Sequence, residues 1–207
     1  MQLPEFVHQQ EKGTTAQDME AIIALCRVVD LKDDFTGLHN KRIGAYCFKT
    51  AMQLGYDEKD SLCISMAAKL HDIGKVFISD SILTKKGKLT PREFNEMKKH
   101  PLLGYETLKH CETNMIMALA KEIVLTHHER WDGSGYPQGL KREEIPFFGR
   151  MVAVADVFDA LIAQRSYKSA WKVDRAVEFI HQNRGKLFDA AAVDAFIESL
   201  QQNVCHH

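Results

Sequence analysis

The sequence lacks the cysteine pattern of a disulfide framework or of a thiolate metal site. Its five cysteines are an odd set, and no two of them have CxxC spacing. Four lie inside apolar, helix-like runs, where cysteine packs as a small hydrophobic side chain. This usage is typical of a reducing environment, so we expect a cytoplasmic protein.

The sequence also lacks a signal peptide, a long apolar run and an excess of positive charge. No apolar run is long enough to cross a bilayer, so no membrane segment is expected. The net charge of -1 argues against a broad basic face for duplex nucleic acid. A few local cations would still suffice to hold a small anionic ligand.

Helical periodicity is the main feature that is present. We find no repeat, linker or low-complexity segment, and the length fits one well-packed domain. We therefore expect an all-α, single-domain bundle, with loops at residues 73–89 and 131–146. The expected helices cover residues 16–31, 36–54, 61–72, 90–100, 101–110, 114–128, 147–164, 171–183 and 189–202.

Capping residues mark several of these helix boundaries. The segment Thr90-Pro91-Arg92-Glu93 is a capping box with proline at the first helical position. Pro101 predicts that this helix stops near His100, because the residue before a proline disfavours the α conformation. The other expected N-caps are Asp60 or Ser61, Asn114 and Asp189.

Histidine and carboxylate side chains recur along the expected helices and at their ends. The candidates are His39, His71, Asp72, His100, His127, His128 and Asp156. Imidazole and carboxylate donors suit iron, manganese, zinc or nickel. A carboxylate between two histidine-bearing helices can bridge two metals, and two metals can clamp an in-line phosphoryl displacement. The pattern therefore predicts a metal-dependent enzyme.

Taken one at a time, these residues have ordinary structural explanations. A lone His39 is most often a surface histidine or one whose hydrogen bonds are satisfied within the fold. His100 is compatible with a simple helix end, and histidines are favoured at a helix C-terminus. Asp156 is harder to explain in this way. It lies in the apolar run at residues 151–158, where an unpaired carboxylate costs several kcal/mol. For the chain to lack a metal site, all of these ordinary explanations would have to be true at the same time.

The order of these motifs resembles the HD-GYP domain, a branch of the HD phosphohydrolase superfamily. The resemblance covers about residues 31–190. It rests on four segments: His71-Asp72-Ile73-Gly74-Lys75, residues 87–101, the HHERWDGSGYP run at 127–137, and residues 155–161. It implies the helical bundle of the HD superfamily. We expect an N-terminal arm and helix at residues 1–30 and an HD-GYP-like catalytic domain at residues 31–203.

The resemblance implies a bacterial phosphodiesterase that hydrolyses cyclic di-GMP to linear pGpG, and sometimes to GMP. The residues that it implies as metal ligands are His71, Asp72, His100, His127, His128 and Asp156. It also implies that Lys75 contacts the scissile phosphate and that Asp159, Arg165 and Lys168 hold the substrate. The positive side chains of Arg165 and Lys168 can neutralise a phosphate. No other basic cluster is obvious near the motifs.

The glycine-rich loop carries an aromatic residue directly after the candidate ligands. Gly133 and Gly135 explain a tight turn, but they do not explain Tyr136. Tyr136 either lines the substrate cleft or braces the loop. In the family, partner proteins such as cyclase domains are thought to meet this loop, and a homodimer is also compatible with the sequence.

One position departs from part of the family. Some members carry a glutamate four residues before the first histidine, where it ligates a third metal, whereas this chain has Phe35. We therefore expect two divalent metal ions, iron or manganese in preference to nickel or zinc. His39 is then expected to be a weaker or outer ligand.

Two other functions stay open at this point. A receptor module that binds the dinucleotide with little turnover would keep the same residues, and product formation would distinguish it from an enzyme. Another HD phosphohydrolase, acting on a mononucleotide, is disfavoured by the complete GYP signature. The sequence does not distinguish cyclic di-GMP from cyclic GMP-AMP.

Overall fold

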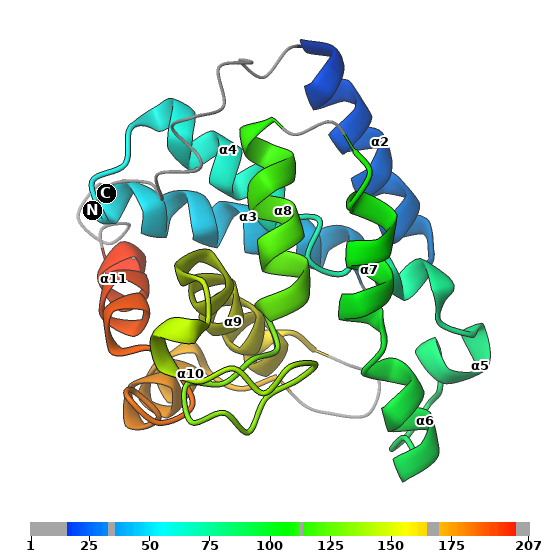
Figure 1. Ribbon diagram of the computed structural model, residues 1–207. Coiled ribbons are helices and arrows are strands. Elements are labelled where there is room, and N and C mark those ends of the chain that lie inside the picture. Colours follow the sequence, from blue (N-terminus) through cyan, green and yellow to red (C-terminus); the bar gives the residue numbers. More distant parts are fainter. Residues whose placement is uncertain (1–15, 33–35, 112–113, 165–169, 202–207) are drawn as a thin grey trace.

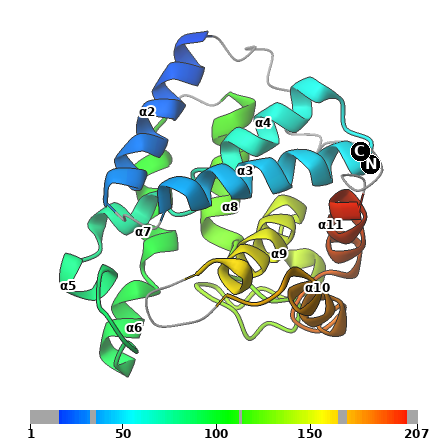
Figure 2. The same ribbon diagram turned by 180° about the vertical axis from the view of Figure 1, so that it is seen from behind.

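Helices form every named element of the part of the chain that the structure describes. The computed structural model describes residues 16–32, 36–111, 114–164 and 170–201 (Figures 1 and 2). The α-helices are α2 (Ala16–Lys32), α3 (Thr36–Gln53), α4 (Glu58–Ala68), α5 (Asp80–Leu83), α6 (Pro91–Met97), α7 (His100–Leu108), α8 (Met115–Thr126), α9 (Phe147–Ile162), α10 (Val173–Gln182) and α11 (Ala190–Gln201). Two short 3-10 helices, η1 (Ile73–Phe77) and η2 (Arg142–Glu144), lie in the connections. The predicted all-α class is confirmed.

Helix α9 lies in the middle of the bundle. It packs against α3, α8, α10 and α11, and Figure 1 shows it among these helices. Most of its residues are buried, as its nearly continuous apolar sequence predicts. The Phe158 ring packs edge-on against Tyr46 of α3 and Phe196 of α11, with centroids 5.5 and 5.1 Å away. A helix held on several sides fixes the position of its few polar residues.

The ends of α4, α7 and α8 are brought together by close packing. Helix α8 contacts α4, α7 and α9, and η1 contacts α7. Gly74 of η1 lies so close to α7 that a Cβ atom there would be 1.9 Å from the carbonyl oxygen of His100. Only glycine permits this approach, which sets the segment after α4 beside the start of α7.

Helix α2 shares the core of the helices that follow it. It packs against α3 and η1, and Ile22, Cys26 and Val29 are buried in the common core. The domain boundary between residues 30 and 31 stays a prediction, but α2 packs into the core of the bundle. Among the described helices, none combines the length and the apolar character that a membrane span requires.

Three of the predicted caps are present. The hydroxyl of Thr90 accepts a hydrogen bond from the backbone N–H of Glu93, and the Glu93 carboxylate accepts one from the backbone N–H of Thr90. The Asn114 side chain accepts from Met117 N at 2.9 Å. The Asp189 carboxylate accepts from Ala191 N at 2.7 Å. Local sequence therefore determines where these three helices begin.

Two local predictions were wrong. Helix α4 begins at Glu58 rather than at Asp60 or Ser61, because Asp57 follows the turn at Gly55 and its side chain accepts from Asp60 N at 2.8 Å. It ends at Ala68, so that His71 lies in a turn and not on the helix. The expected loop at residues 73–89 contains η1 and α5.

Candidate metal centre and substrate cleft

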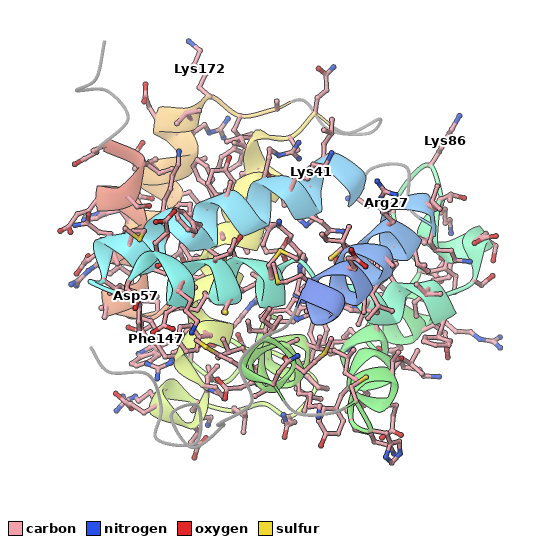
Figure 3. All side chains as sticks on the ribbon, turned by 90° about the horizontal axis from the view of Figure 1, so that it is seen from above. Arg27, Lys41, Asp57, Lys86, Phe147 and Lys172 are labelled. Atoms are coloured by element: carbon pink, nitrogen blue, oxygen red, sulfur yellow. The ribbon has the colours of Figure 1, made fainter. Side chains whose placement is uncertain are left out.

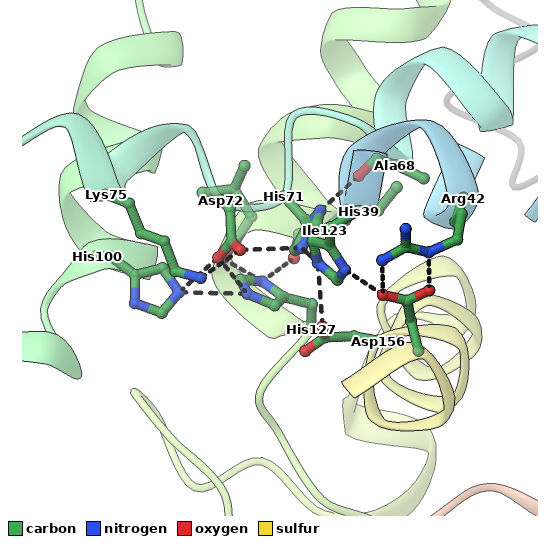
Figure 4. A network of polar contacts seen from close by, with 12 residues as sticks. His39, Arg42, Ala68, His71, Asp72, Lys75, His100, Ile123, His127 and Asp156 are labelled. Atoms are coloured by element: carbon green, nitrogen blue, oxygen red, sulfur yellow. Dashed lines mark hydrogen bonds and ion pairs between the residues drawn. The ribbon is translucent and has the colours of Figure 1, made fainter. Parts of the chain in front are cut away.

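Four histidines from four parts of the chain converge on one buried carboxylate, Asp72 (Figure 4). His39 comes from α3, His71 from the turn after α4, His100 from the first residue of α7 and His127 from the end of α8. The Nε2 atoms of His39 and His71 are 3.4 Å apart, and those of His100 and His127 are 3.3 Å apart. All five residues are less than a tenth exposed.

The opposite ring nitrogen of each of these histidines faces a protein acceptor. The Nδ1 contacts are His71 with Ala68 O at 2.8 Å, His100 with Met97 O at 2.8 Å, His127 with Ile123 O and Val124 O at 3.1 Å, and His39 with Asp159 Oδ2 at 2.7 Å. In this tautomer Nδ1 donates and Nε2 carries a lone pair. Paired lone pairs at this separation repel each other unless a cation lies between them. The arrangement is that of metal-binding histidines, whose Nδ1 partner fixes the ring.

Asp72 joins two groups of possible ligands. One group contains Asp72, His100, His127 and His128, and the other contains His39, His71 and Asp72. Its Oδ2 accepts from the Lys75 ammonium at 2.5 Å, whereas its buried Oδ1 has no hydrogen-bond partner in the described structure. Burial alone would raise the pKa of Asp72, but Lys75 and His71 hold it well below its ordinary value. An ionised, partly unsatisfied carboxylate between two histidine groups fits a bridging ligand of two metals.

His128 and Asp156 lie beside this cluster. Burial and the neighbouring His127 and His100 hold the pKa of His128 well below its ordinary value, which keeps the ring neutral. Asp156 Oδ1 is 3.4 Å from His39 Nε2. The structure thus brings the seven predicted ligands together, and their binding of metal stays a prediction.

Asp159 occupies a place different from the expected one. It is 1% exposed, and its oxygens accept from His39 Nδ1 at 2.7 Å and from Arg42 Nε and a terminal nitrogen at 2.5 and 2.8 Å. Because both oxygens are engaged, the side chain is not placed to accept from a guanine edge. Burial raises the pKa of Asp159, but Arg42 and His39 outweigh this effect and lower it.

His39 also differs from its expected position as an outer ligand. Its hydrogen bond to Asp159 turns Nε2 toward His71, so the ring lies inside the cluster. Burial lowers the pKa of His39, but the bond to Asp159 and the nearby Asp156 outweigh it, so the pKa is raised. Arg42, which secures Asp159, was not recognised in the sequence, because 117 residues separate the two.

A cleft of about 420 Å³ opens beside the histidines. Its lining residues are Phe94, Lys98, His127, His128, Glu129, Arg130, Ser134, Gly135, Tyr136, Ala153, Val157, Phe179, Leu187 and Phe188. The Tyr136 ring stacks on His128, with centroids 4.7 Å apart, and lies edge-on to Phe94 at 6.4 Å. Of the two alternatives for Tyr136, the geometry supports a place in the cleft wall. Burial raises the pKa of its phenol, so Tyr136 stays protonated.

The glycine-rich loop is fastened to the ligand segment from within. The buried Glu129 carboxylate accepts from the backbone N–H groups of Gln138 and Gly139 at 2.7 and 3.1 Å. Tyr136 N donates to His128 O at 3.2 Å. A Cβ atom on Gly135 would lie 2.5 Å from the Glu129 Cα, so glycine is needed there for close approach. The role of Glu129 was missed, because its partners are set by the folding of the loop.

Several predicted residues lie outside the described part of the chain. These are Arg165, Lys168 and Phe35. The expectation for the two cations came from the resemblance, supported by the lack of another obvious basic cluster near the motifs, and it stays a prediction. Folding also brings Lys98 and Arg130 into the lining of the cleft.

Comparison with known proteins agrees with this geometry. Residues 24–192 match the family model described as an HD domain. The chain is 46% identical over 186 residues to the cyclic di-GMP phosphodiesterase response regulator RpfG of Xanthomonas campestris, covering 90% of this chain and 49% of RpfG. It is 42% identical over 179 residues to the 3'3'-cGAMP-specific phosphodiesterase 2 of Vibrio cholerae, covering 86% of this chain and 34% of that protein.

A solved structure shows the same fold. Bd1817, an HDG"Y"P protein from Bdellovibrio bacteriovorus, aligns with a TM-score of 0.62 at 19% identity, covering 79% of this chain and 51% of that chain. The chain spans about half the length, or less, of the curated relatives it matches. The predicted resemblance is confirmed, and the chain belongs to the HD domain family.

Proposed function

We propose that this chain is the catalytic part of a metal-dependent phosphodiesterase that hydrolyses a cyclic dinucleotide. Cyclic di-GMP, converted to linear pGpG in bacterial second-messenger signalling, is the first candidate substrate, because it is in the name of the Xanthomonas relative. Cyclic GMP-AMP is the second, because it is in the name of the Vibrio relative. The convergence of four histidines on the Oδ1 and Oδ2 atoms of Asp72 carries the proposal.

The proposal assigns two divalent metals to the cluster, iron or manganese in preference to nickel or zinc. The holding residues are His39, His71, Asp72, His100, His127, His128 and Asp156, with Asp72 shared by both groups. When bound, the metals supply Lewis-acid polarisation of a phosphoryl oxygen. Asp72 keeps its charge because Lys75 lies against it.

Lys75 has the second catalytic role. Its ammonium lies 2.5 Å from Asp72 Oδ2, at the edge of the cluster (Figure 4). A cation there stabilises the negative charge that develops on the phosphate as its bond to the ribose 3′ oxygen breaks. Tyr136 lines the cleft and contacts the substrate. Asp159 acts through His39 rather than on the nucleotide.

Purification under anaerobic conditions, followed by elemental analysis and product chromatography, tests the proposal. We expect two metals per chain, and linear dinucleotide as the main product from cyclic di-GMP or cyclic GMP-AMP. Tight binding without product would favour the receptor module, and turnover of a mononucleotide alone would favour another HD phosphohydrolase. Three tightly held metals, or rapid release of GMP, would contradict the two-metal assignment.

The proposed substrate contacts of Arg165 and Lys168 have their own test. Replacing both with alanine should raise KM for the cyclic dinucleotide about tenfold or more, because each removes a charged contact to phosphate. Bis(p-nitrophenyl) phosphate, which has no second phosphate, should be much less affected. Lys172→Ala is the matched control, since this exposed side chain points away from the bundle (Figure 3). Equal losses on both substrates would give the two residues a structural role.

A cyclase-domain partner at the glycine-rich loop, a homodimer and a cytoplasmic location stay predictions. Support for a partner at this loop comes from Glu129, whose hydrogen bonds to Gln138 and Gly139 hold the loop backbone in one conformation.

A further inference from the structure

Helix α6 contributes the aromatic ring of Phe94 to the cleft, and its C-cap residue contributes the ammonium of Lys98. The proposed chemistry uses neither side chain. We propose that Phe94, Lys98 and Tyr136 form a subsite for one nucleotide of the substrate. The Phe94 ring stacks on the base, the Lys98 ammonium pairs with a phosphate, and Tyr136 forms the inner wall. This inference rests on the proposed function and names the part of the dinucleotide that α6 recognises.

The charge of Lys98 is left available by its surroundings. The neighbouring lysines are occupied, since Lys99 pairs with Glu96 at 2.7 Å and Lys85 pairs with Glu93 at 2.6 Å. Within the described ranges, Lys98 has no carboxylate at ion-pair distance. Its side chain is half-buried in the cleft wall, where a cation beside the histidine cluster attracts an anion.

Phe94 presents a ring to the same space. It is 47% exposed and lines the cleft. The ammonium of Lys98 lies 5.3 Å from its ring centroid, one helical turn away. One helix face thus offers a π-surface and a cation together. A nucleotide carries the matching pair, a base with a π-face and a phosphate.

The rings continue from Phe94 to the metal ligands. Phe94 meets the edge of Tyr136, and Tyr136 stacks on His128 of the ligand group. A nucleotide held at α6 is therefore next to the phosphate that the cluster would hold. The cleft volume of about 420 Å³ has room for a purine nucleotide beside the histidines.

The subsite predicts discrimination between large and small diesters. Lys98→Ala should raise KM for the cyclic dinucleotide about tenfold, because a charged contact to phosphate is lost. Phe94→Leu, which keeps bulk but removes the π-face, should raise it about fivefold. In both variants kcat should fall less than KM rises, and bis(p-nitrophenyl) phosphate hydrolysis should change less than dinucleotide hydrolysis. Lys98→Arg should restore most of the affinity.

Matched controls and a binding measurement separate this idea from its alternatives. Lys99→Ala removes a neighbouring charge, and Phe77→Ala removes an aromatic ring that is 59% exposed and does not line the cleft. Titration calorimetry with a phosphorothioate analogue of the cyclic dinucleotide should show the same rise in Kd for Lys98→Ala as the kinetics show in KM. Equal effects of Lys98→Ala and Lys99→Ala would overturn the subsite and indicate a long-range charge effect.

Failure of the subsite is distinguishable from failure of the proposed function. If the unchanged protein neither binds nor hydrolyses a cyclic dinucleotide, the proposed function is wrong. If it does both, and the Phe94 and Lys98 variants behave like the controls, only the subsite is wrong.

Discussion

At the scale of single residues, the centre depends on Asp72. Its carboxylate is 2% exposed and touches both histidine groups, so its charge holds together side chains from different parts of the chain. Asp72→Ala should abolish metal retention in both groups and lower phosphodiester turnover about a thousandfold or more. Elemental analysis and product chromatography measure the two effects. Circular dichroism should still report a helical fold.

The control for this variant is Asp174→Ala, at an exposed aspartate of α10. It should keep both metal content and turnover. Wild-type turnover in Asp72→Ala would rule out the two-metal mechanism.

The chain Arg42–Asp159–His39 leads to a second residue-scale prediction. Asp159 fixes the ring that carries one Nε2 of the cluster. Asp159→Asn should weaken the metal held by His39, His71 and Asp72 about 10- to 100-fold, as is usual for a residue that orients a ligand. Competition with a chelator, followed by elemental analysis, measures the loss of one metal but not of both.

Arg42→Ala should weaken the same metal in the same direction, because it releases Asp159. Lys41→Ala, at the exposed neighbouring position, is its control. If Asp159→Asn lost both metals equally, the side chain would be a general structural element and not a partner of His39.

The sequence indicated the candidate ligands that the structure brings together, but it did not indicate the residues that orient them. His127 and His128 stand together before a glycine-rich turn, so their neighbourhood alone makes them conspicuous. The partner of Asp159 is 117 residues away, and no local pattern connects the two. Tertiary packing decides which carboxylate lies between the histidines and which faces an arginine.

At the scale of elements, predictions succeeded where a local hydrogen bond decides the boundary. Thr90 and Asn114 each make the cap that their sequence context indicates. The predicted start of α4 was wrong. Asp57 and Asp60 are both good caps, and only the turn before Asp57 selects Asp57. The short η1 and α5 were missed, since helices of a few residues depend on packing more than on periodicity.

The glycine-rich loop supplies the element-scale prediction. The Glu129 carboxylate accepts hydrogen bonds from two backbone N–H groups of this loop. The position of the loop determines where the Tyr136 ring lies. Glu129→Ala should free these amides, so hydrogen exchange at Gln138 and Gly139 should speed up about tenfold or more. Because the Tyr136 ring then loses its fixed place in the cleft, KM should rise together with the loss of protection.

Glu129→Gln keeps a carbonyl oxygen for the same two donors and should preserve most of the protection. Glu143→Ala, at an exposed glutamate near the end of the same loop, is the control. Unchanged exchange in Glu129→Ala would show that the loop is held by other contacts.

At the scale of the whole molecule, Arg150 connects three parts of the fold. It extends from α9, forms an ion pair with Asp189 at the start of α11, and lies over the ring of Trp131 in the loop after the ligands, 5.5 Å from its centroid. The sequence had indicated Asp189 as a cap but not as an ion-pair partner. The half-buried Glu122 of α8 is close enough to Arg150 to be influenced by its charge.

Glu122 therefore links global stability to pH. Burial raises its pKa from 4.5 to about 7, and the Arg150 charge only partly opposes this. A carboxyl group with a raised pKa in the folded state stabilises that state fully below the unfolded pKa of about 4.5, and this stability is lost as the pH rises through about 7. Glu122→Gln keeps the side chain neutral, so at pH 8 it should increase the free energy of unfolding by up to about 3 kcal/mol.

Near pH 4.5 the two proteins should unfold at similar temperatures, and an exposed control, Glu143→Gln, should show no such trend. Thermal unfolding across this pH range checks the result, because pH effects from metal binding are common to both proteins and cancel in the difference. A difference between Glu122→Gln and the unchanged protein that did not vary with pH would mean that Glu122 is not protonated in the fold.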